Sequence, residues 1–244
     1  MDTFNIIQLG LLAVLLGYFL YYVYTLLFSK SYQPLIWKSK LKKGMISQEL
    51  HKAERKYMDK ARFFNFWFQV ERLKKDKVLG SFAELGVYKG DSAEIIHLMD
   101  PSREIHLFDT FEGFHQKDLE VETGKAATYT VHNFADTSIE RVKQKLKSDK
   151  FIFHKGYFPD TTEYIINEKF ALVNMDADLY NPTKAGLEFF YPRLSPGGVI
   201  IIHDYNPEWP GIMKAVDDFA QTLSISIVPL TDTDSSAMLF KQAN

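Results

Sequence analysis

The 244-residue chain contains no cysteine. Disulfide bridges, thiolate metal sites and a cysteine nucleophile are therefore excluded, although this absence is compatible with either side of a membrane. The chain also lacks a G-x-G-x-x-G loop for the pyrophosphate of a dinucleotide and a nucleophile elbow for a serine hydrolase. No internal repeat or low-complexity tract is found. These absences argue against disulfide scaffolds, cysteine and serine hydrolases, and ordinary dinucleotide enzymes.

Charge is distributed unevenly along the chain. Residues 30–80 carry 14 Lys and Arg against 5 Asp and Glu, whereas residues 81–244 carry 15 against 25. A nucleic-acid-binding protein would place its positive charge on the folded domain, so we expect no nucleic-acid partner. The apolar content of 46% allows a full core. The length suits one domain of about 160–200 residues with an appendage.

Charge is absent from Thr3 to Ser29, and residues 5–28 are almost wholly apolar. As a helix, residues 5–28 would span about 36 Å, enough to cross a hydrocarbon core of about 30 Å. A signal peptide should start with basic residues and end at a small-residue cleavage site, and neither is found; a buried core helix is the other alternative. The lysines that follow predict a single-pass membrane protein with the rest of the chain in the cytoplasm. These lysines are Lys30, Lys38, Lys40, Lys42 and Lys43.

Residues 44–79 are predicted to be largely helical, with aromatic residues of the 63–68 segment among basic ones. Such a helix either lies on lipid or packs against its own domain or a second copy, and a homo-oligomer is one arrangement that the sequence leaves open. We therefore divide the chain into a transmembrane anchor (1–29), a basic, largely helical juxtamembrane region (30–79) and a folded domain (80–244).

The centre of the folded domain is predicted to be a strand, a helix and a strand. Phe170–Met175 and Val199–Ile202 are the apolar runs of the two strands. Asn181 is expected to cap the helix between them, with proline at the next position. A crossover of this kind makes the strands parallel neighbours, so Asp176 and Asp204 should lie side by side where open α/β sheets bind ligands.

The remaining pattern completes an α/β domain. Residues 115–135 are polar and irregular, as lids often are. The other expected elements are strands at 81–87, 104–108 and 151–154, helices ending at 99 and spanning 136–147 and 211–220, and a hairpin of 224–230 with 237–241. This gives about seven strands with the last antiparallel. The predicted fold is a Rossmann-like class I methyltransferase: a mostly parallel, seven-stranded sheet with a C-terminal antiparallel hairpin.

Two turns are candidate ligand sites. After the first strand, Gly86 and Gly90 lie in a turn that leads into a helix N-terminus, where free N–H groups and glycine backbone can approach a ligand. Asp109 ends the second strand and is placed to accept ribose hydroxyls. Each motif has an ordinary alternative, a structural βα turn for the glycines and a solvated capping residue for Asp109.

Taken together, these motifs resemble the macrocin and mycinamicin sugar O-methyltransferase family, which depends on S-adenosylmethionine and magnesium. The matching text is FAELGVYKGDSA, LFDTFEGF, HKGYFPDT, DADLYNPTKAGLEFFYPRLSPGGVIII, DY and PGIMKAVDDF, in order over about residues 80–240. The resemblance implies that three groups of residues bind the cofactor. Those around its methionine end are Glu84, Gly86, Val87, Tyr88, Gly90 and Ser92. Those that hold ribose and adenosine are Asp109, Phe111, Glu112 and Gly113, and those on the adenine side are Pro159 and Asp160.

The resemblance also implies a Mg²⁺ site at Asp176, His203 and Asp204, where the family has a third aspartate in place of His203. Magnesium prefers oxygen ligands, and imidazole suits Mn, Fe or Zn better. His203 is therefore a ligand in a site with changed metal preference, a general base beside a weaker site, or a hydrogen-bonding residue where the metal has been lost. Asp178 either supplies a further carboxylate or caps the following turn.

The expected reaction is methyl transfer from S-adenosylmethionine to a hydroxyl of a sugar or another vicinal diol, assisted by a divalent cation, with Asp176 or His203 accepting the proton. The acceptor would be a small molecule or a lipid-linked glycan. The alternative is a membrane-tethered scaffold that keeps the fold with a decayed metal site. A short-chain dehydrogenase is disfavoured, although Tyr180 and Lys184 have the spacing of its catalytic pair, because Pro182 interrupts them.

Overall fold

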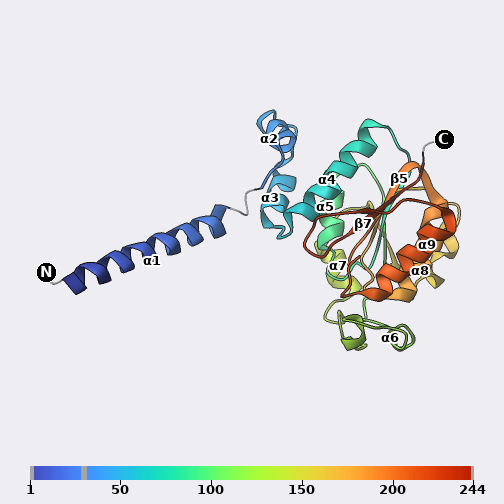
Figure 1. The fold of residues 1–244 in the computed structure, drawn as a ribbon. Coiled ribbons are helices and arrows are strands. Elements are labelled where there is room, and N and C mark those ends of the chain that lie inside the picture. Colours follow the sequence, from blue (N-terminus) through green and yellow to red (C-terminus); the bar gives the residue numbers. More distant parts are fainter. Residues whose placement is uncertain (1–2, 29–31, 243–244) are drawn as a thin grey trace. The chain divides into compact units, whose positions relative to one another are not determined.

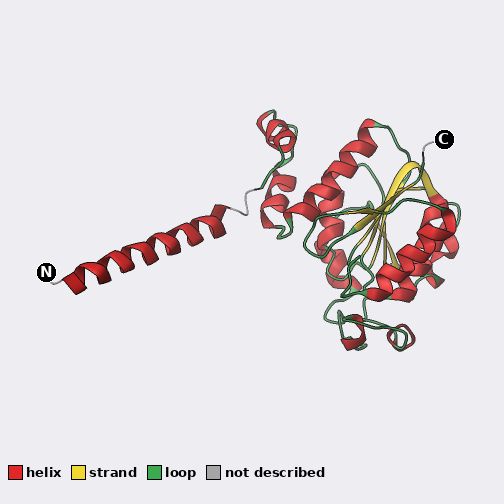
Figure 2. Cartoon of the chain, in the orientation of Figure 1, coloured by secondary structure: helices red, strands yellow, loops and turns green. Residues whose placement is uncertain are grey.

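The computed structural model describes residues 3–28 and 32–242. The chain divides into two compact units, Met1–Lys60 and Ala61–Asn244. Figure 1 follows the sequence through them, and Figure 2 shows their secondary structure. Lys30, one of the predicted juxtamembrane lysines, lies outside the described residues. The predicted boundary between residues 79 and 80 stays a prediction; by contacts, the aromatic segment 63–68 belongs to the second unit.

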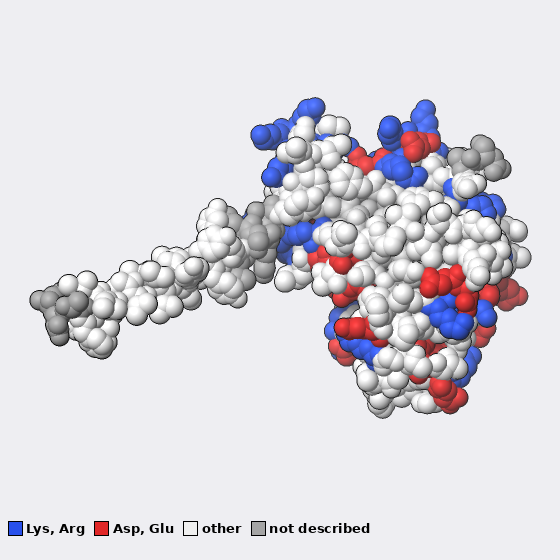
Figure 3. All heavy atoms as spheres, viewed as in Figure 1, with Lys and Arg blue, Asp and Glu red and all other residues white. Residues whose placement is uncertain are grey.

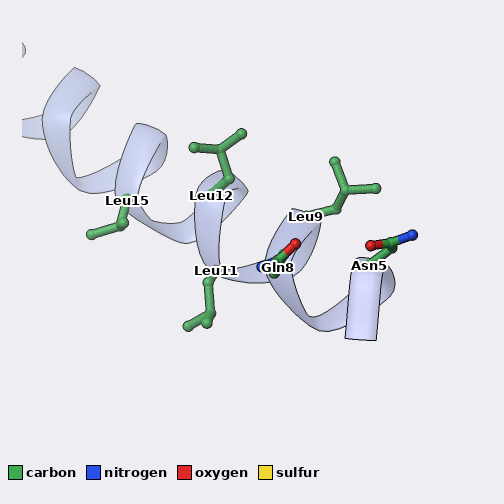
Figure 4. A pocket seen from close by; sticks show the side chains of 6 residues that line it. All are labelled: Asn5, Gln8, Leu9, Leu11, Leu12 and Leu15. Carbon is green, nitrogen blue, oxygen red and sulfur yellow. The ribbon is translucent and has the colours of Figure 1, made fainter. Parts of the chain in front are cut away.

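In its described residues, the first unit forms α1 (Thr3–Phe28), α2 (Leu35–Lys42) and α3 (Gln48–Lys56). The stretch Phe4–Thr25 of α1 is long and apolar enough to cross a membrane and is not buried within the structure. A hollow along α1 is lined by Asn5, Gln8, Leu9, Leu11, Leu12 and Leu15 (Figure 4). All six project from one helix, and one helix surrounds no ligand, so this hollow is only the space between neighbouring side chains.

Glu54 joins the parts of the first unit that follow α1. Its buried carboxylate accepts a hydrogen bond from Gln33 Nε2 (3.0 Å) and pairs with Lys60 Nζ (3.1 Å). At the start of α3, Ser47 Oγ accepts from Leu50 N (3.1 Å), which satisfies one of the free N–H groups of the first turn. The region 44–79, predicted to be largely helical, contains two helices, α3 and α4 (Lys60–Lys75).

The second unit is an α/β sandwich around a seven-stranded sheet in the order β3-β2-β1-β4-β5-β7-β6. Five neighbouring strands are parallel, and β7 runs antiparallel to both β5 and β6, as predicted. The strands are β1 (Ser81–Leu85), β2 (Ile105–Asp109), β3 (Phe151–Lys155), β4 (Phe170–Met175), β5 (Leu194–Ile202), β6 (Val228–Pro229) and β7 (Ala237–Phe240).

Helices cover both faces of this sheet (Figures 1 and 2). One face carries α4, α5 (Asp91–Met99) and α7 (Ile139–Lys145), and the other carries α8 (Tyr180–Arg193) and α9 (Pro210–Leu223). The short α6 (Gln116–Leu119), η2 (Ala126–Thr128) and η3 (Asp160–Ile165) lie in the connections. Burial of both faces explains why the central strands are nearly continuous apolar runs.

Aromatic side chains dominate the packing on both faces. On the α8 side, the Phe190 ring lies 5.2 Å from Phe170 and 5.6 Å from Phe108, all fully buried. On the other side, α4 buries Phe66 and Trp67. The aromatic helix that sequence alone left between lipid and protein therefore packs on its own domain, because its apolar face is needed to cover the sheet.

Several predicted boundaries are wrong. The helix α8 begins at Tyr180 with Leu179 as N-cap, so Asn181 lies inside the first turn and does not cap it. The strand β5 begins at Leu194 rather than Val199, because the Ser-Pro-Gly-Gly segment continues along the sheet. The strand β6 is only Val228–Pro229 instead of 224–230.

Candidate active site

Three neighbouring strands end at the same level. Leu85 of β1 pairs with Met175 of β4, and Met175 pairs with Ile202 of β5. The backbone hydrogen bonds of the sheet continue one residue beyond these strand ends on both sides of β4. Asp176 N donates to Leu85 O (2.8 Å), and His203 N donates to Met175 O (2.9 Å). The residues after β1, β4 and β5 therefore meet at the carboxyl edge, beside the point where the strand order reverses and α/β folds bind ligands.

The glycine turn after β1 is held against the neighbouring strand. Gly86 has φ +85°, and a Cβ built there would lie 1.9 Å from the carbonyl oxygen of Asp176. Gly90, with φ +72°, precedes α5, and a Cβ there would lie 3.1 Å from Val142 Cγ1. Gly86 is thus required for close packing of the chain itself, and Gly90 suits its position mainly through its left-handed φ. The predicted contact of this turn with a ligand stays a prediction.

Asp109 joins the turns that follow β1 and β2. Its Oδ2 accepts hydrogen bonds from Val87 N (2.7 Å) and Tyr88 N (2.8 Å), and its Oδ1 accepts from Phe111 N (2.6 Å). A carboxylate has about four acceptor positions. Asp109 can therefore accept one further donor, such as a ribose hydroxyl, while it fixes the two turns to each other.

Glu84 lies beneath the glycine turn and is completely buried. Its Oε1 accepts from Ser92 Oγ and from Asn174 Nδ2 (2.8 Å). Burial raises the pKa of Glu84 to about 8, although these two hydrogen bonds oppose the rise. Its Oε2 has no hydrogen-bond partner among the described residues. Glu84 thus links β1, α5 and β4 and keeps one polar atom for a water or a ligand.

The other residues predicted to bind a cofactor follow β2 and β3. Glu112 pairs with Lys155 Nζ (2.6 Å), at the end of β3. Gly113 has φ +90° and packs against the backbone of the segment after α6. Pro159 and Asp160 are exposed at the start of η3. The structure thus brings these residues to the same end of the sheet, and their contact with a cofactor stays a prediction.

Three carboxylates converge after β4 and β5. One ligand oxygen from each of Asp176, Asp178 and Asp204 lies within 4.8 Å of the other two. Asp178 and Asp204 both have left-handed φ angles, of 59° and 57°. Aspartate adopts this region more readily than most residues, and such conformations cluster at functional sites. The predicted neighbours Asp176 and Asp204 are brought together, and Asp178 joins them.

The crowding of carboxylates changes their proton affinity. Burial, followed by the nearby Asp176, raises the pKa of Asp204 to about 7. Burial and the charges of Asp176 and Asp204 raise the pKa of Asp178 well above its usual range. A cation bound among the three oxygens would relieve this repulsion, and hard divalent cations prefer such an all-oxygen donor set. The residues present therefore fit a divalent metal.

His203 stands beside this cluster rather than within it. Only 2% of its side chain is exposed, and its Nε2 is 2.8 Å from Asn174 Oδ1. Its Nδ1 lies 3.5 Å from Asp176 Oδ2 and has no hydrogen-bond partner among the described residues. Burial lowers the pKa of His203, with Asp176 opposing. One ring nitrogen is thus committed to the strand, and only Nδ1 is available for a metal or a proton.

An arginine balances the acidic edge. Arg62 of α4 pairs with Asp232 Oδ2 (3.2 Å) and Asp234 Oδ2 (2.7 Å), in the segment between β6 and β7. Asn206 Nδ2 also donates to the carbonyl of Asp234 (2.7 Å). Asp234 raises the pKa of Asp204 and Arg62 lowers it, both less than burial does. This segment therefore forms one wall of the site.

The predicted lid is fastened to the helices behind it. Glu122 Oε1 accepts from Tyr180 N (2.5 Å), the first residue of α8. Asp118 Oδ1 accepts from Tyr157 Oη (2.9 Å) and Asn181 Nδ2 (2.9 Å). The N-terminus of α8 is thus satisfied by a side chain from the lid, which no local sequence signal could indicate.

Tyr129, in the loop 115–135 that is predicted to be a lid, lies close enough to the acidic cluster for the carboxylates to affect its pKa. Its ring stacks on Phe114 at 5.5 Å. Burial raises the pKa of Tyr129 to about 12, with further contributions from Asp178 and Asp204. Tyr129 is therefore a neutral phenol near the three carboxylates. Sequence reasoning identified its loop but not this residue, and it missed Asn174, whose signal is an amide inside an apolar strand.

Comparison with known proteins identifies the family of this chain. A family model described as Macrocin-O-methyltransferase (TylF) matches residues 41–242. The chain belongs to this family. Its members include proteins named as O-methyltransferases, and the chain is an S-adenosylmethionine-dependent O-methyltransferase, as its sequence motifs predict. The apolar helix α1 lies outside the match.

Individual relatives agree. The chain is 28% identical to an 8-demethyl-8-(2,3-dimethoxy-alpha-L-rhamnosyl)-tetracenomycin-C 4'-O-methyltransferase from Streptomyces olivaceus, over 74% of this chain and 72% of that protein. It is 31% identical to Mycinamicin III 3''-O-methyltransferase from Micromonospora griseorubida, over 68% of this chain and 70% of that protein. The O-methyltransferase NovP shares the fold with a TM-score of 0.67 at 24% identity, over 76% of this chain and 81% of that chain.

The turn after β1 fits the cofactor of this family. Glu84 Oε2 is a buried acceptor without a partner among the described residues, and Asp109 retains acceptor capacity. Asp109 would accept from a ribose hydroxyl of S-adenosylmethionine. Glu84 would accept from the ammonium in its ionised form, which the positive charge of that group would favour. Both lie at the same sheet edge as the acidic cluster.

Proposed function

We propose that the enzyme methylates a hydroxyl of a sugar or another vicinal diol with the help of a divalent cation. The observation that carries this proposal is the convergence of Asp176, Asp178 and Asp204, with ligand oxygens within 4.8 Å of one another. The sugar is supported by the names of the two relatives, which refer to a rhamnosyl-tetracenomycin and to mycinamicin III. A cation held by these carboxylates would bind neighbouring oxygens of such an acceptor.

The metal ligands in this proposal are Asp176 and Asp204, with Asp178 supplying a third oxygen. His203 takes part through Nδ1, either as a further ligand or as the base. Its imidazole would shift the metal preference toward Mn²⁺, whereas a base role leaves an oxygen-only site suited to Mg²⁺. The hydrogen bond from its other nitrogen to Asn174 supports both roles, because metal-binding and basic histidines are commonly oriented in this way.

S-adenosylmethionine supplies the methyl group as a sulfonium, and a bound divalent cation would lower the pKa of a coordinated hydroxyl. The protein's own part is to take the proton and to align the reactants. Asp176, 34% exposed, and the Nδ1 of His203 at 3.5 Å form the proton-accepting pair. The carbon–oxygen bond forms as the carbon–sulfur bond breaks, and the proton moves to this pair. Holding oxygen, methyl and sulfur in line supplies much of the acceleration.

Membrane attachment through α1 completes the proposal. A 22-residue apolar stretch without burial, followed by lysines, supports a single-pass anchor with the catalytic unit in the cytoplasm. An anchored enzyme is suited to a lipid-linked glycan, although a small-molecule acceptor stays open. Mass spectrometry of envelope glycans from cells with and without the protein tests this, since loss of one methyl group from a glycan is expected when the protein is absent.

Substitution of the cluster tests the chemistry. Asp204→Asn should abolish divalent-dependent methyl transfer and leave the binding of S-adenosylmethionine, measured by calorimetry, nearly unchanged. The matched control is Asp218→Asn, an exposed aspartate of α9 that pairs with Lys214. Unchanged turnover in Asp204→Asn would refute the metal assignment. Cofactor binding without any divalent-dependent turnover in the wild type would favour the scaffold alternative instead.

A further inference from the structure

The helix α2 follows α1 after a short connection. Six residues, 29–34, connect Phe28 to Leu35. Fully extended, six residues reach at most about 20 Å. If α1 crosses the membrane as proposed above, the start of α2 therefore lies within about 20 Å of the end of α1, whatever the path of the connection, and is within reach of the bilayer surface. The inference below rests on that proposed anchor.

One side of α2 is exposed and mixes apolar with basic residues. Leu35 and Ile36 are 85% and 51% exposed, although both are large aliphatic residues. At 100° per residue, Lys38 and Lys42 fall on the same side as Leu35, and both are exposed. Trp37, on the opposite side, is completely buried. The helix thus packs through one face and presents Leu35 and Ile36 outward between lysine stems.

The charge around α2 is of one sign. Residues 32–47 contain four lysines and no Asp or Glu. Figure 3 shows Lys and Arg, and no acidic side chain on the visible face, over the part of the chain that carries α2. The first acidic residue after this stretch is Glu49. Lys38, Lys42 and Lys43 thus have no acidic neighbour within this stretch of sequence.

We propose that this surface, the α2 face, docks on anionic lipid headgroups. The α2 face consists of Leu35, Ile36, Lys38, Lys42 and Lys43. Lysine stems reach phosphates while the aliphatic side chains enter the boundary with the acyl chains, the usual arrangement of a helix lying in an interface. The acidic catalytic unit could pair with the lysines, but it would leave Leu35 and Ile36 in water. A lipid surface satisfies both kinds of residue.

The absence of cysteine allows a clean test, because Ile36→Cys provides the only thiol. The full-length protein, labelled there with an environment-sensitive fluorophore, is placed in nanodiscs of phosphatidylcholine alone or mixed with phosphatidylglycerol. Spin-labelled lipids serve as quenchers. We expect strong lipid quenching in the anionic nanodiscs, weaker quenching in the neutral ones, and loss of the difference at high salt. The matched control is a label at Leu223→Cys, 46% exposed on α9.

A charge variant makes the result specific. Lys38→Gln, Lys42→Gln and Lys43→Gln together should reduce the anionic preference by about fivefold per lysine. Equal quenching in neutral and anionic nanodiscs, or quenching equal to that at Leu223, overturns the proposal. A blue-shifted label without lipid quenching also overturns it and indicates the acidic unit or a second copy as the occupant.

Flotation with vesicles after an alkaline wash separates this proposal from the anchor. A chain that does not float shows that α1 is no anchor, and the docking inference fails with it. A chain that floats but whose label at position 36 is not quenched shows that the anchor is right and the docking wrong. Methyl transfer is measured separately and decides neither outcome.

Discussion

His203 Nε2 lies 2.8 Å from Asn174 Oδ1, and the same amide donates through Nδ2 to Glu84 Oε1 at 2.8 Å. Since an amide oxygen only accepts, a neutral His203 carries its proton on Nε2 and a lone pair on Nδ1. That lone pair faces Asp176 at 3.5 Å. Asn174 therefore orients His203 for accepting a proton or a metal while it connects the histidine to the cofactor turn.

Asn174→Leu should break this connection. Two buried polar groups would lose a partner, so we expect the free energy of unfolding to fall by about 1–3 kcal/mol. The ring nitrogens of His203 should also lose their fixed tautomer, which nitrogen-15 chemical shifts report directly. The control is Asn167→Ala at an exposed position. A folded variant with unchanged histidine shifts would contradict the assigned tautomer.

Asp178→Asn should raise thermal stability in the absence of metal at pH 7.5. Burial and then Asp176 and Asp204 raise the pKa of Asp178, so the folded state keeps a proton that the unfolded state releases above about pH 4. Stability is therefore lost as pH rises, and the gain from Asn should vanish near pH 4. Melting curves measure this.

The same variant should lose most of the stabilisation that Mg²⁺ or Mn²⁺ gives the wild type, because a ligand is missing. The control Asp218→Asn should keep it. A metal-induced shift in melting temperature that is equal in Asp178→Asn and wild type would remove Asp178 from the metal site.

His154→Gln should flatten the acid side of the stability profile. His154 stacks on Phe108 at 4.4 Å and lies 2.9 Å from His106 through Nε2. Burial, and then His106, lowers the pKa of His154 to about 4. Between pH 6.5 and 4 the unfolded chain binds a proton that the folded chain refuses, so stability falls as pH falls through this window.

Urea unfolding at pH 5 and pH 7.5 measures the effect. The difference between the two pH values should be smaller in His154→Gln than in wild type, because glutamine keeps a hydrogen-bonding group but does not titrate. His132→Gln, at an exposed position of the lid, should leave the difference unchanged. An unchanged difference between the two pH values in His154→Gln would show that His154 and His106 do not control stability in acid.

Glu122→Ala should release the lid from α8. The lost hydrogen bond to Tyr180 N leaves the helix start without its cap, at a cost of about 1 kcal/mol. We expect faster tryptic cleavage at Lys117 and Lys125 and a higher KM for the acceptor. Glu122→Gln should restore the wild-type pattern because its amide oxygen still accepts. Glu120→Ala, exposed in the same loop, is the control, and equal cleavage in both alanine variants would argue against a latch.

Much of the fold could be predicted because its signals are local. The run Phe170–Met175 is long enough and apolar enough to be a buried strand wherever it lies, and its bounds are those observed. The starts of helices and strands depend on more distant residues. The sequence around Asn181 has the residue types of a capped start, yet the N–H of Tyr180 is bonded by Glu122, 58 residues before Tyr180. A partner so distant leaves no trace in the local pattern.

The sequence by itself determined the order of the strands' apolar runs, the acidic residues that follow them, and the lysines and apolar helix at the N-terminus. These depend on neighbouring residues, whose periodicity and charge act wherever the chain goes. Only the tertiary structure decided that Asp178 joins Asp176 and Asp204, that His203 turns one nitrogen to Asn174, and that Glu122 holds the lid. Each of these depends on strand register and side-chain rotamers, which are settled by packing between distant segments and cannot be read from either segment alone.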